Sequence, residues 1–181
     1  IDHALQTKAE SLLRGVSGAA VAMEPGSGRI LALASSPAFD QNYFAVGMSH
    51  DQWDTLISNP FRPMENKAIQ GEYPPGSTYK IITALAGLEE GVIDENTRVF
   101  CPGFYHFGNR TYRCWKKGGH GQVEILKAIT ESCDVYFYKV GEMLGVDRLA
   151  WYATASGLGS PTGINLDKEA RGLIPTAAWK K

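Results

Sequence analysis

The sequence has no long apolar run, no excess of charge of one sign and few cysteines. None of its apolar runs approaches the roughly 18 consecutive residues that a membrane span requires. No charged segment followed by an apolar run occurs at the N-terminus, so no signal peptide is predicted. The net charge of -1 excludes strong electrostatic attraction to nucleic acid, so no nucleic-acid partner is predicted. Three cysteines cannot all pair within one chain.

The first residue limits what these absences mean. Ile1 is not an initiator methionine, and a helical pattern begins directly after it. We therefore expect the sequence to be a piece of a longer protein, from which a targeting or anchoring segment has been removed. With 181 residues, of which 44% are hydrophobic, the chain is still long enough for one domain with its own core.

The apolar pattern of the first half predicts both helix and strand. Residues 2–14 have helical spacing, whereas residues 18–24 and 28–35 are apolar runs around a turn of Pro, Gly and Ser. These two runs barely alternate, which predicts a largely buried β-hairpin. Residues 36–76 contain many prolines and are predicted to be irregular, except for a short helix after Ser49, which is a good N-cap residue.

The second half is predicted to be mainly helical. A helix is expected from Ser77 to a stop at Gly91, because glycine is the usual residue just past a helix end. The Gly-rich stretch 99–121 and the tail to Lys181 are predicted to be irregular. Three further helices are predicted, at about 122–131, 133–144 and 146–156.

Ser77 and Lys80 lie three residues apart at the start of a predicted helix. Pro74, Pro75 and Gly76 force a non-helical approach to this point. A serine hydroxyl becomes a good nucleophile only when a nearby base takes its proton, and a desolvated lysine can be that base. The alternative is that Ser77 is only an N-cap and Lys80 a solvated helix residue.

A second motif favours the catalytic interpretation. Ser132 and Asp134 form a Ser-x-Asp sequence 55 residues after Ser77, at the junction of two predicted helices. This arrangement fits the second element of the S-x-x-K, S-x-N and K-T-G set of penicillin-interacting serine enzymes.

All three cysteines lie within a 33-residue window together with one histidine, in the order Cys101, Cys114, His120 and Cys133. Three thiolates and one imidazole fill a tetrahedral structural zinc site. The Gly-rich loop around them has few apolar residues, so a metal would hold it in place of a core. Buried free thiols and a single disulfide are the alternatives. The remaining histidines are predicted to be surface residues.

Several runs of residues are similar to the elongation-type penicillin-binding protein 2 family, which belongs to the class B penicillin-binding proteins. The resemblance covers about residues 15–181 and is carried by the segments MEPGSGRILALASSPAFDQN, GEYPPGSTYK, YRCWKKGGHG, ESCDVYFYKVGEMLGVDRL and GLIPTAAWK.

The resemblance implies a truncated α+β fold of the β-lactamase/transpeptidase type, with residues 1–181 as the N-terminal portion of the transpeptidase domain. It implies a peptidoglycan D,D-transpeptidase that cross-links stem peptides and is acylated by β-lactams. It also implies a place at the periplasmic face of the bacterial inner membrane, beside a membrane glycosyltransferase and the elongation complex. No organic cofactor is implied.

Residue by residue, the resemblance makes Ser77 the acyl-accepting nucleophile and Lys80 its proton acceptor. Ser132 would be a proton-relay hydroxyl, and Asp134 stands where Asn is more usual in the second motif. A carboxylate beside Lys80 favours the charged lysine, so its action as a base stays open. Relatives often have carboxylates at positions 101 and 114, which are also zinc ligands.

The third motif of the family is missing from this sequence. No Lys-Thr-Gly or Lys-Ser-Gly follows Asp134, although the strand bearing that motif supplies one of two oxyanion-hole N–H groups in relatives. Losing one such donor costs about 10²–10³ in rate, so this chain is expected to be weakly active or inactive.

Two other functions compete with a transpeptidase. A serine β-lactamase or β-lactam sensor would need a deacylating carboxylate, which the two motifs do not supply. The second competing function is that of a metal-stabilised structural or interaction module without catalysis. In that case, apolar surface left uncovered is expected to make the chain self-associate.

Overall fold

Residues 1–180 are described by a computed structural model, and they divide into two units. The first unit comprises residues 1–72 and 163–170, and the second comprises residues 73–162 and the segment from Arg171 onward. Both helices and strands are present, as the sequence predicts. None of the helices in the described part of the chain has the length and apolar character to cross a membrane.

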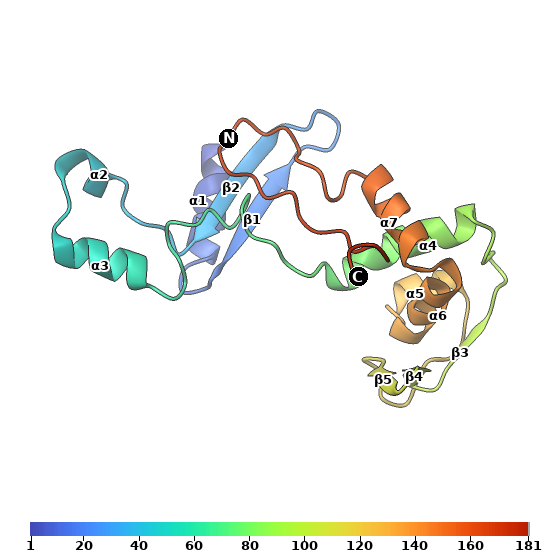
Figure 1. The fold of residues 1–181 in the computed structure, drawn as a ribbon. Helices are drawn as coiled ribbons and strands as arrows, with labels where there is room; N and C mark the ends of the chain where they lie inside the picture. Colours follow the sequence, from blue (N-terminus) through green and yellow to red (C-terminus); the bar gives the residue numbers. More distant parts are fainter. Residues whose placement is uncertain (181) are drawn as a thin grey trace. The chain divides into compact units, whose positions relative to one another are not determined.

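The first unit contains the predicted N-terminal helix and β-hairpin (Figure 1). Helix α1 (His3–Leu12) is capped by Asp2, and strands β1 (Gly18–Met23) and β2 (Ile30–Ser36) pair antiparallel. The Gln6 side chain lies against β2, where its amide accepts from Leu33 N–H at 2.8 Å and donates to Leu33 O at 3.1 Å. Helix α1 therefore satisfies main-chain groups on the outer edge of β2.

The prediction that this hairpin is largely buried is wrong. Residues in β1 alternate between half-buried and exposed, and only Ala32 and Ala34 of β2 are buried. Only α1, among the described helices, packs extensively against the pair of strands. Its cover is too small to bury both faces of the hairpin.

Two short helices follow in the first unit. Helix α2 (Asn42–Val46) was not predicted, and it is only about one turn long; its N-cap residue Gln41 makes no side-chain cap, although Asp40 Oδ1 accepts from Asn42 N–H at 2.9 Å. Helix α3 (His50–Ser58) confirms the short predicted helix, because Ser49 forms a capping box with Gln52.

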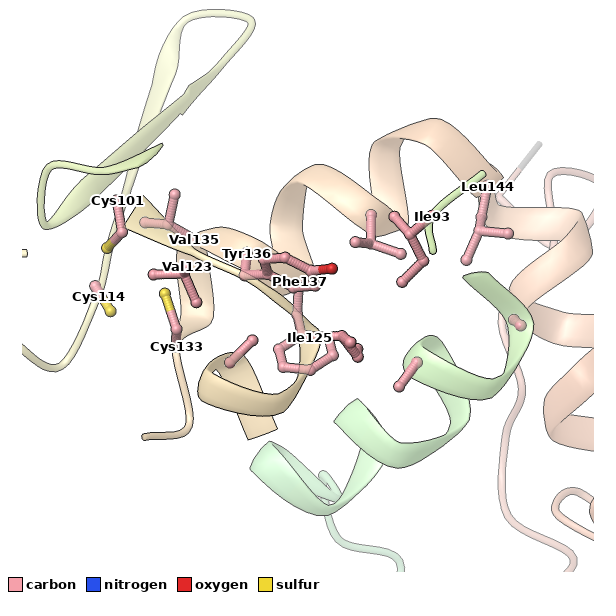
Figure 2. Packing of buried hydrophobic residues seen from close by; sticks show 14 residues of the cluster. Ile93, Cys101, Cys114, Val123, Ile125, Cys133, Val135, Tyr136, Phe137 and Leu144 are labelled. Carbon is pink, nitrogen blue, oxygen red and sulfur yellow. The ribbon is translucent and has the colours of Figure 1, made fainter. Parts of the chain in front are cut away.

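The second unit is built on four helices. The 3₁₀ turn η1 (Gly76–Tyr79) leads into α4 (Lys80–Glu89), and α5 (Ile125–Thr130), α6 (Asp134–Leu144) and α7 (Val146–Ala155) confirm the three predicted downstream helices. Their buried faces form one core, which Figure 2 shows running from the cysteines at one end to Leu144 and Ile93 at the other. The described tail contains no helix or strand, as predicted.

Residues 99–121 are not irregular, contrary to prediction. Strand β3 (Val99–Cys101) pairs with β6 (Gly121–Val123), and β4 (Phe104–Phe107) pairs with β5 (Arg110–Arg113). These strands are three or four residues long and mostly exposed. The sequence therefore has no apolar alternation from which they could be predicted. The glycines instead permit close packing, since a Cβ on Gly119 would lie 2.1 Å from Cys101 O.

Candidate active site and cysteine–histidine cluster

Ser77 lies in the 3₁₀ turn that precedes α4. Pro75 is the N-cap residue, and Gly76 has φ 57°, a left-handed conformation that suits glycine. Residues three apart are eclipsed along a 3₁₀ helix, so Ser77 and Lys80 share one face. The first N–H groups of a helix have no intrahelical acceptor, and Ser77 is one of the residues that carry them here.

Ser132 lies at the end of α5 in a conformation that is unusual for serine. Its φ is 51°, and its N–H donates to Ile129 O at 3.2 Å. The next N–H, of Cys133, donates to Ala128 O at 2.9 Å. These two bonds are a Schellman motif, in which the left-handed position is normally glycine. The turn separates α5 from α6 and directs the Ser132 carbonyl and hydroxyl oxygens toward the same lysine.

The Lys80 ammonium contacts three oxygens of the second motif. Its Nζ donates to Asp134 Oδ1 at 2.6 Å, to Ser132 O at 2.9 Å and to Ser132 Oγ at 3.0 Å. The ring centroid of Phe137 lies 5.8 Å from the same atom. Three acceptors match the three N–H donors of a charged lysine. Lys80 Nζ and the Asp134 carboxylate therefore form an ion pair in a partly buried setting.

The hydroxyl of Ser132 connects this lysine to Ser77. Ser132 Oγ accepts from Lys80 and donates to Ser77 Oγ, 3.1 Å away. The four residues named from the two motifs thus lie in one connected hydrogen-bond network. In this arrangement a proton can pass between Lys80 and Ser77 through the Ser132 hydroxyl.

A fifth residue in this network was missed by the sequence analysis. The main-chain N–H of Trp115 donates to Asp134 Oδ2 at 3.0 Å, on the side of the carboxylate that faces away from Lys80. A main-chain donor leaves no signature in residue type, so no motif could have identified it. Its neighbour Cys114 was the only signal at this position.

The four predicted metal ligands converge in one buried cluster. The sulfur atoms of Cys101, Cys114 and Cys133 and a ring nitrogen of His120 all lie within 4.8 Å of one another. Figure 2 shows the three cysteines side by side at one end of the core. His120 Nδ1 lies 3.6 Å from the sulfur of Cys101 and 3.5 Å from that of Cys114. All three cysteines are free, which contradicts the disulfide alternative.

These distances fit a tetrahedral zinc site. With a Zn–S distance of about 2.3 Å and a Zn–N distance of about 2.0 Å, sulfur and nitrogen ligands of one zinc ion lie about 3.5 Å apart. The second ring nitrogen of His120 is buried without a hydrogen bond to any described residue and lies 3.7 Å from Glu131 Oε2. A carboxylate beside the non-ligating nitrogen is the usual surrounding of a zinc-bound histidine.

The thiols of the cluster differ in acidity. Burial raises the pKa of Cys133 to about 12, and the charges of the neighbouring cysteines add to that effect. Burial also raises the pKa of Cys101, but hydrogen bonds from the backbone N–H groups of His120 and Gly103, together with those from the Cys133 and Cys114 thiols, outweigh it and leave this pKa below its usual value. Three adjacent buried sulfurs do not all ionise without a compensating positive charge.

The other histidines lie outside the cluster. His3, His50 and His106 are exposed, as predicted. His106, on β4, forms a hydrogen bond through its Nδ1 atom with the hydroxyl of Thr111, at 2.9 Å.

Comparisons with known proteins identify the fold around these residues. The penicillin binding protein transpeptidase domain model matches residues 18–181. The peptidoglycan D,D-transpeptidase MrdA of Acinetobacter baumannii is 42% identical over 182 residues, which cover 99% of this chain and 27% of that protein. The chain therefore spans less than a third of the length of that curated relative.

Solved structures agree with this assignment. The crystal structure of Pseudomonas aeruginosa PBP2 in complex with WCK 5153 superposes with a TM-score of 0.91 at 42% identity, covering 99% of this chain and 40% of that one. PBP2 of Helicobacter pylori, in a complex with MreC, superposes with a TM-score of 0.92 at 37% identity, covering 98% and 33%. The predicted β-lactamase/transpeptidase-like fold is confirmed. The chain belongs to the penicillin-binding protein transpeptidase family, within its PBP2 and MrdA branch.

Proposed function

We propose that this chain carries the nucleophile side of the active site of a peptidoglycan D,D-transpeptidase. The observation that supports it most is the hydrogen-bond path from Ser77 through the Ser132 hydroxyl to Lys80. The names of the curated relatives give the reaction and the substrate class, since they act in peptidoglycan cross-linking as D,D-transpeptidases.

In the acylation step, Ser77 Oγ forms a bond with the carbonyl carbon of the scissile D,D-peptide bond, and that C–N bond breaks to release an amine that takes up a proton from the relay. The proton of Ser77 Oγ passes to the Ser132 hydroxyl, which gives its own proton to Lys80. This direction requires Lys80 to have lost one proton beforehand. The arrangement that the structure holds, with Lys80 donating to Ser132 and Ser132 to Ser77, has the opposite direction and suits protonation of Ser77 Oγ when the acyl group leaves it for the acceptor.

The oxyanion that forms in this step needs two N–H donors. The N–H of Ser77 at the helix start is one of them, where the helix dipole also favours negative charge. The second comes from the Lys-Thr-Gly strand in relatives, and that motif is absent from these 181 residues. We therefore propose that the chain alone is acylated weakly or not at all.

Acylation by a fluorescent penicillin, located by mass spectrometry, tests the nucleophile. The chain extended through a Lys-Thr-Gly segment should be labelled at Ser77 and hold the label for hours, whereas Ser77→Ala should not be labelled. Ser58→Ala, at an exposed serine of the first unit, is the control and should label normally. Labelling of Ser77→Ala would refute the assignment. Turnover within seconds would instead favour a β-lactamase.

We further propose that the cysteine–histidine cluster holds a structural zinc ion. Three thiolates and one imidazole leave no open position for a substrate, so the ion would fix the loop and not take part in the reaction. Because Cys133 lies between Ser132 and Asp134, the same ion would hold the second motif in place. Elemental analysis of tag-free reduced protein tests this, and a content below about 0.2 zinc per chain would refute it.

An apolar face of α4 supports the expectation that the isolated chain self-associates. Ile81, Leu85 and Leu88 are 65%, 44% and 44% exposed, although the opposite face of α4 is packed in the core. A helix that is apolar on both sides is normally covered on both. Light scattering should give a mass above that of a monomer, and Ile81→Lys should lower it; a monomeric wild-type chain would contradict this expectation.

The partners and location of the whole protein are proposals from its relatives. PBP2 of Helicobacter pylori forms a complex with MreC, so we propose a related complex here, with a membrane glycosyltransferase alongside, at the periplasmic face of the inner membrane. Copurification of the intact protein with membranes and with these partners tests this proposal.

A further inference from the structure

Asp134 accepts hydrogen bonds on both of its carboxylate oxygens, from opposite sides. Oδ1 accepts from Lys80 at 2.6 Å, and Oδ2 accepts from the main-chain N–H of Trp115 at 3.0 Å. We propose that Trp115 is a positioning residue of this active site, whose main-chain N–H fixes the Asp134 carboxylate in contact with Lys80. This inference rests on the proposed transpeptidase function.

Trp115 is itself attached to the other side of the Ser132 turn. Its indole Nε1–H donates to Glu131 O at 2.9 Å, while its main-chain N–H reaches Asp134. One residue thus bonds to both neighbours of the Ser132–Cys133 pair. Because Ser132 has a strained left-handed conformation, two bonds across the turn help to keep its hydroxyl in place.

The indole is not held in place by burial. Trp115 is 64% exposed, so its position depends on the bond to Glu131 and on an edge contact with His120, with ring centroids 5.4 Å apart. Its main chain is fixed from the other side, since Cys114 N–H donates to Gly103 O at 2.9 Å. The Trp115 N–H is therefore aimed by the loop that carries Cys114.

This arrangement also explains why the second motif ends in Asp. An Asn at position 134 has one acceptor oxygen and one NH₂ group, whereas both neighbours here are donors. If the Asn oxygen faced Lys80, its NH₂ group would face the Trp115 N–H. If the amide were turned over, its NH₂ group would face the Lys80 ammonium instead. A carboxylate is the side chain of this size that accepts from both.

The experiment uses the protein extended through its Lys-Thr-Gly segment. An ester in place of the amide at position 115, introduced as the α-hydroxy analogue of tryptophan, deletes only this N–H group. The acylation rate constant should fall about 10-fold, because a hydrogen bond to a charged group is lost, while affinity in the preceding non-covalent complex stays unchanged. Asp134→Asn should show a similar fall, and its Trp115 amide proton should move upfield in the NMR spectrum.

Trp115→Phe keeps the main-chain N–H but removes the bond to Glu131, so a smaller fall of about 3-fold is expected. Trp151→Phe is the matched control, because Trp151 is also 64% exposed but lies on α7. An ester variant that acylates like wild type would overturn the inference. If the ester variant does not fold, a Trp115 amide proton whose chemical shift is the same in Asp134→Asn as in wild type would overturn it.

Failure of the broader proposal gives a different result. If Ser77→Ala still forms the acyl-enzyme, the proposed function is wrong. If Ser77→Ala is inert but the position-115 variants match wild type, the function stands and only the role of Trp115 falls.

Discussion

The helices α4 and α5 end with the same pair of main-chain hydrogen bonds but with different residues in the left-handed position. After α4, Gly91 has φ 63° and donates to Leu88 O at 3.1 Å, and Val92 donates to Gly87 O at 3.1 Å. After α5, the equivalent position is Ser132, with φ 51°. A side chain in this conformation costs about 1–2 kcal/mol, so stability alone favours glycine at both ends.

The difference lies in what the side chain does. The Ser132 hydroxyl lies 3.1 Å from that of Ser77, and glycine could not supply it. Strained backbone of this kind persists where the surroundings over-determine it, often at active sites. The end of α5 has such surroundings, namely the cluster that contains Cys133 and the two bonds from Trp115. The glycine end of α4 needs no such support.

Removal of the metal should produce the largest difference in stability between the ends of α4 and α5. Chelation of the proposed zinc ion should expose the Cys133 amide to hydrogen exchange while the Val92 amide keeps its protection. With zinc about 1,000-fold above its dissociation constant, the loss is about 4 kcal/mol. Exchange measured by mass spectrometry before and after chelation checks this. Equal deprotection of both amides, or of neither in protein shown to contain zinc, would contradict it.

Ser132→Gly should make the end of α5 resemble that of α4 and remove the proposed relay. In the protein extended through a Lys-Thr-Gly segment, the acylation rate constant should fall about 10²-fold, the lower range for loss of a general acid–base group. Ser156→Gly, at a serine outside the hydrogen-bond network of the two motifs, is the control for loss of a hydroxyl elsewhere. A Ser132→Gly rate close to wild type would show that the proton takes another path.

The same comparison shows what the sequence could predict. Gly91 correctly indicated where α4 ends, because glycine at a helix C-terminus has a direct conformational cause. The end of α5 was placed by its spacing alone, and the left-handed serine had no signal in residue type. The proximity of Ser77 and Lys80 followed from their spacing and that of Ser132 from its match to the second family motif, whereas their roles stay predictions.

What sequence reasoning missed depends on main-chain geometry and on short elements. The strands between Val99 and Val123 are too short and too exposed to show a period of two. The bond from Trp115 to Asp134 uses a main-chain N–H, which every residue except proline possesses. The predicted metal ligands were easier to find, because thiols and imidazoles are few and chemically distinct.

Gly91→Ser is the reverse exchange and places a side chain where nothing compensates its strain. It should destabilise the protein by about 1–2 kcal/mol and lower the melting temperature by several degrees in calorimetry. Gly26→Ser is the matched control, because Gly26 does not have a positive φ and a Cβ there meets nothing within 4 Å. A melting temperature unchanged in both variants would mean that the left-handed turn tolerates serine freely.

The smallest expected effect comes from a pair of variants that separates the free-energy cost of the left-handed backbone at Ser132 from the loss of its hydroxyl. Ser132→Ala and Ser132→Gly both remove the bonds of Oγ to Lys80 and Ser77, but only glycine relieves the left-handed strain. Because the unfolded glycine variant also gains chain entropy, its net advantage over alanine should be roughly 0.5–1 kcal/mol in denaturant unfolding. Both variants should be equally poor in acylation. If the alanine variant were the more stable, the Ser132 backbone would not be strained, and its conformation would need no compensation from Trp115 or the cluster.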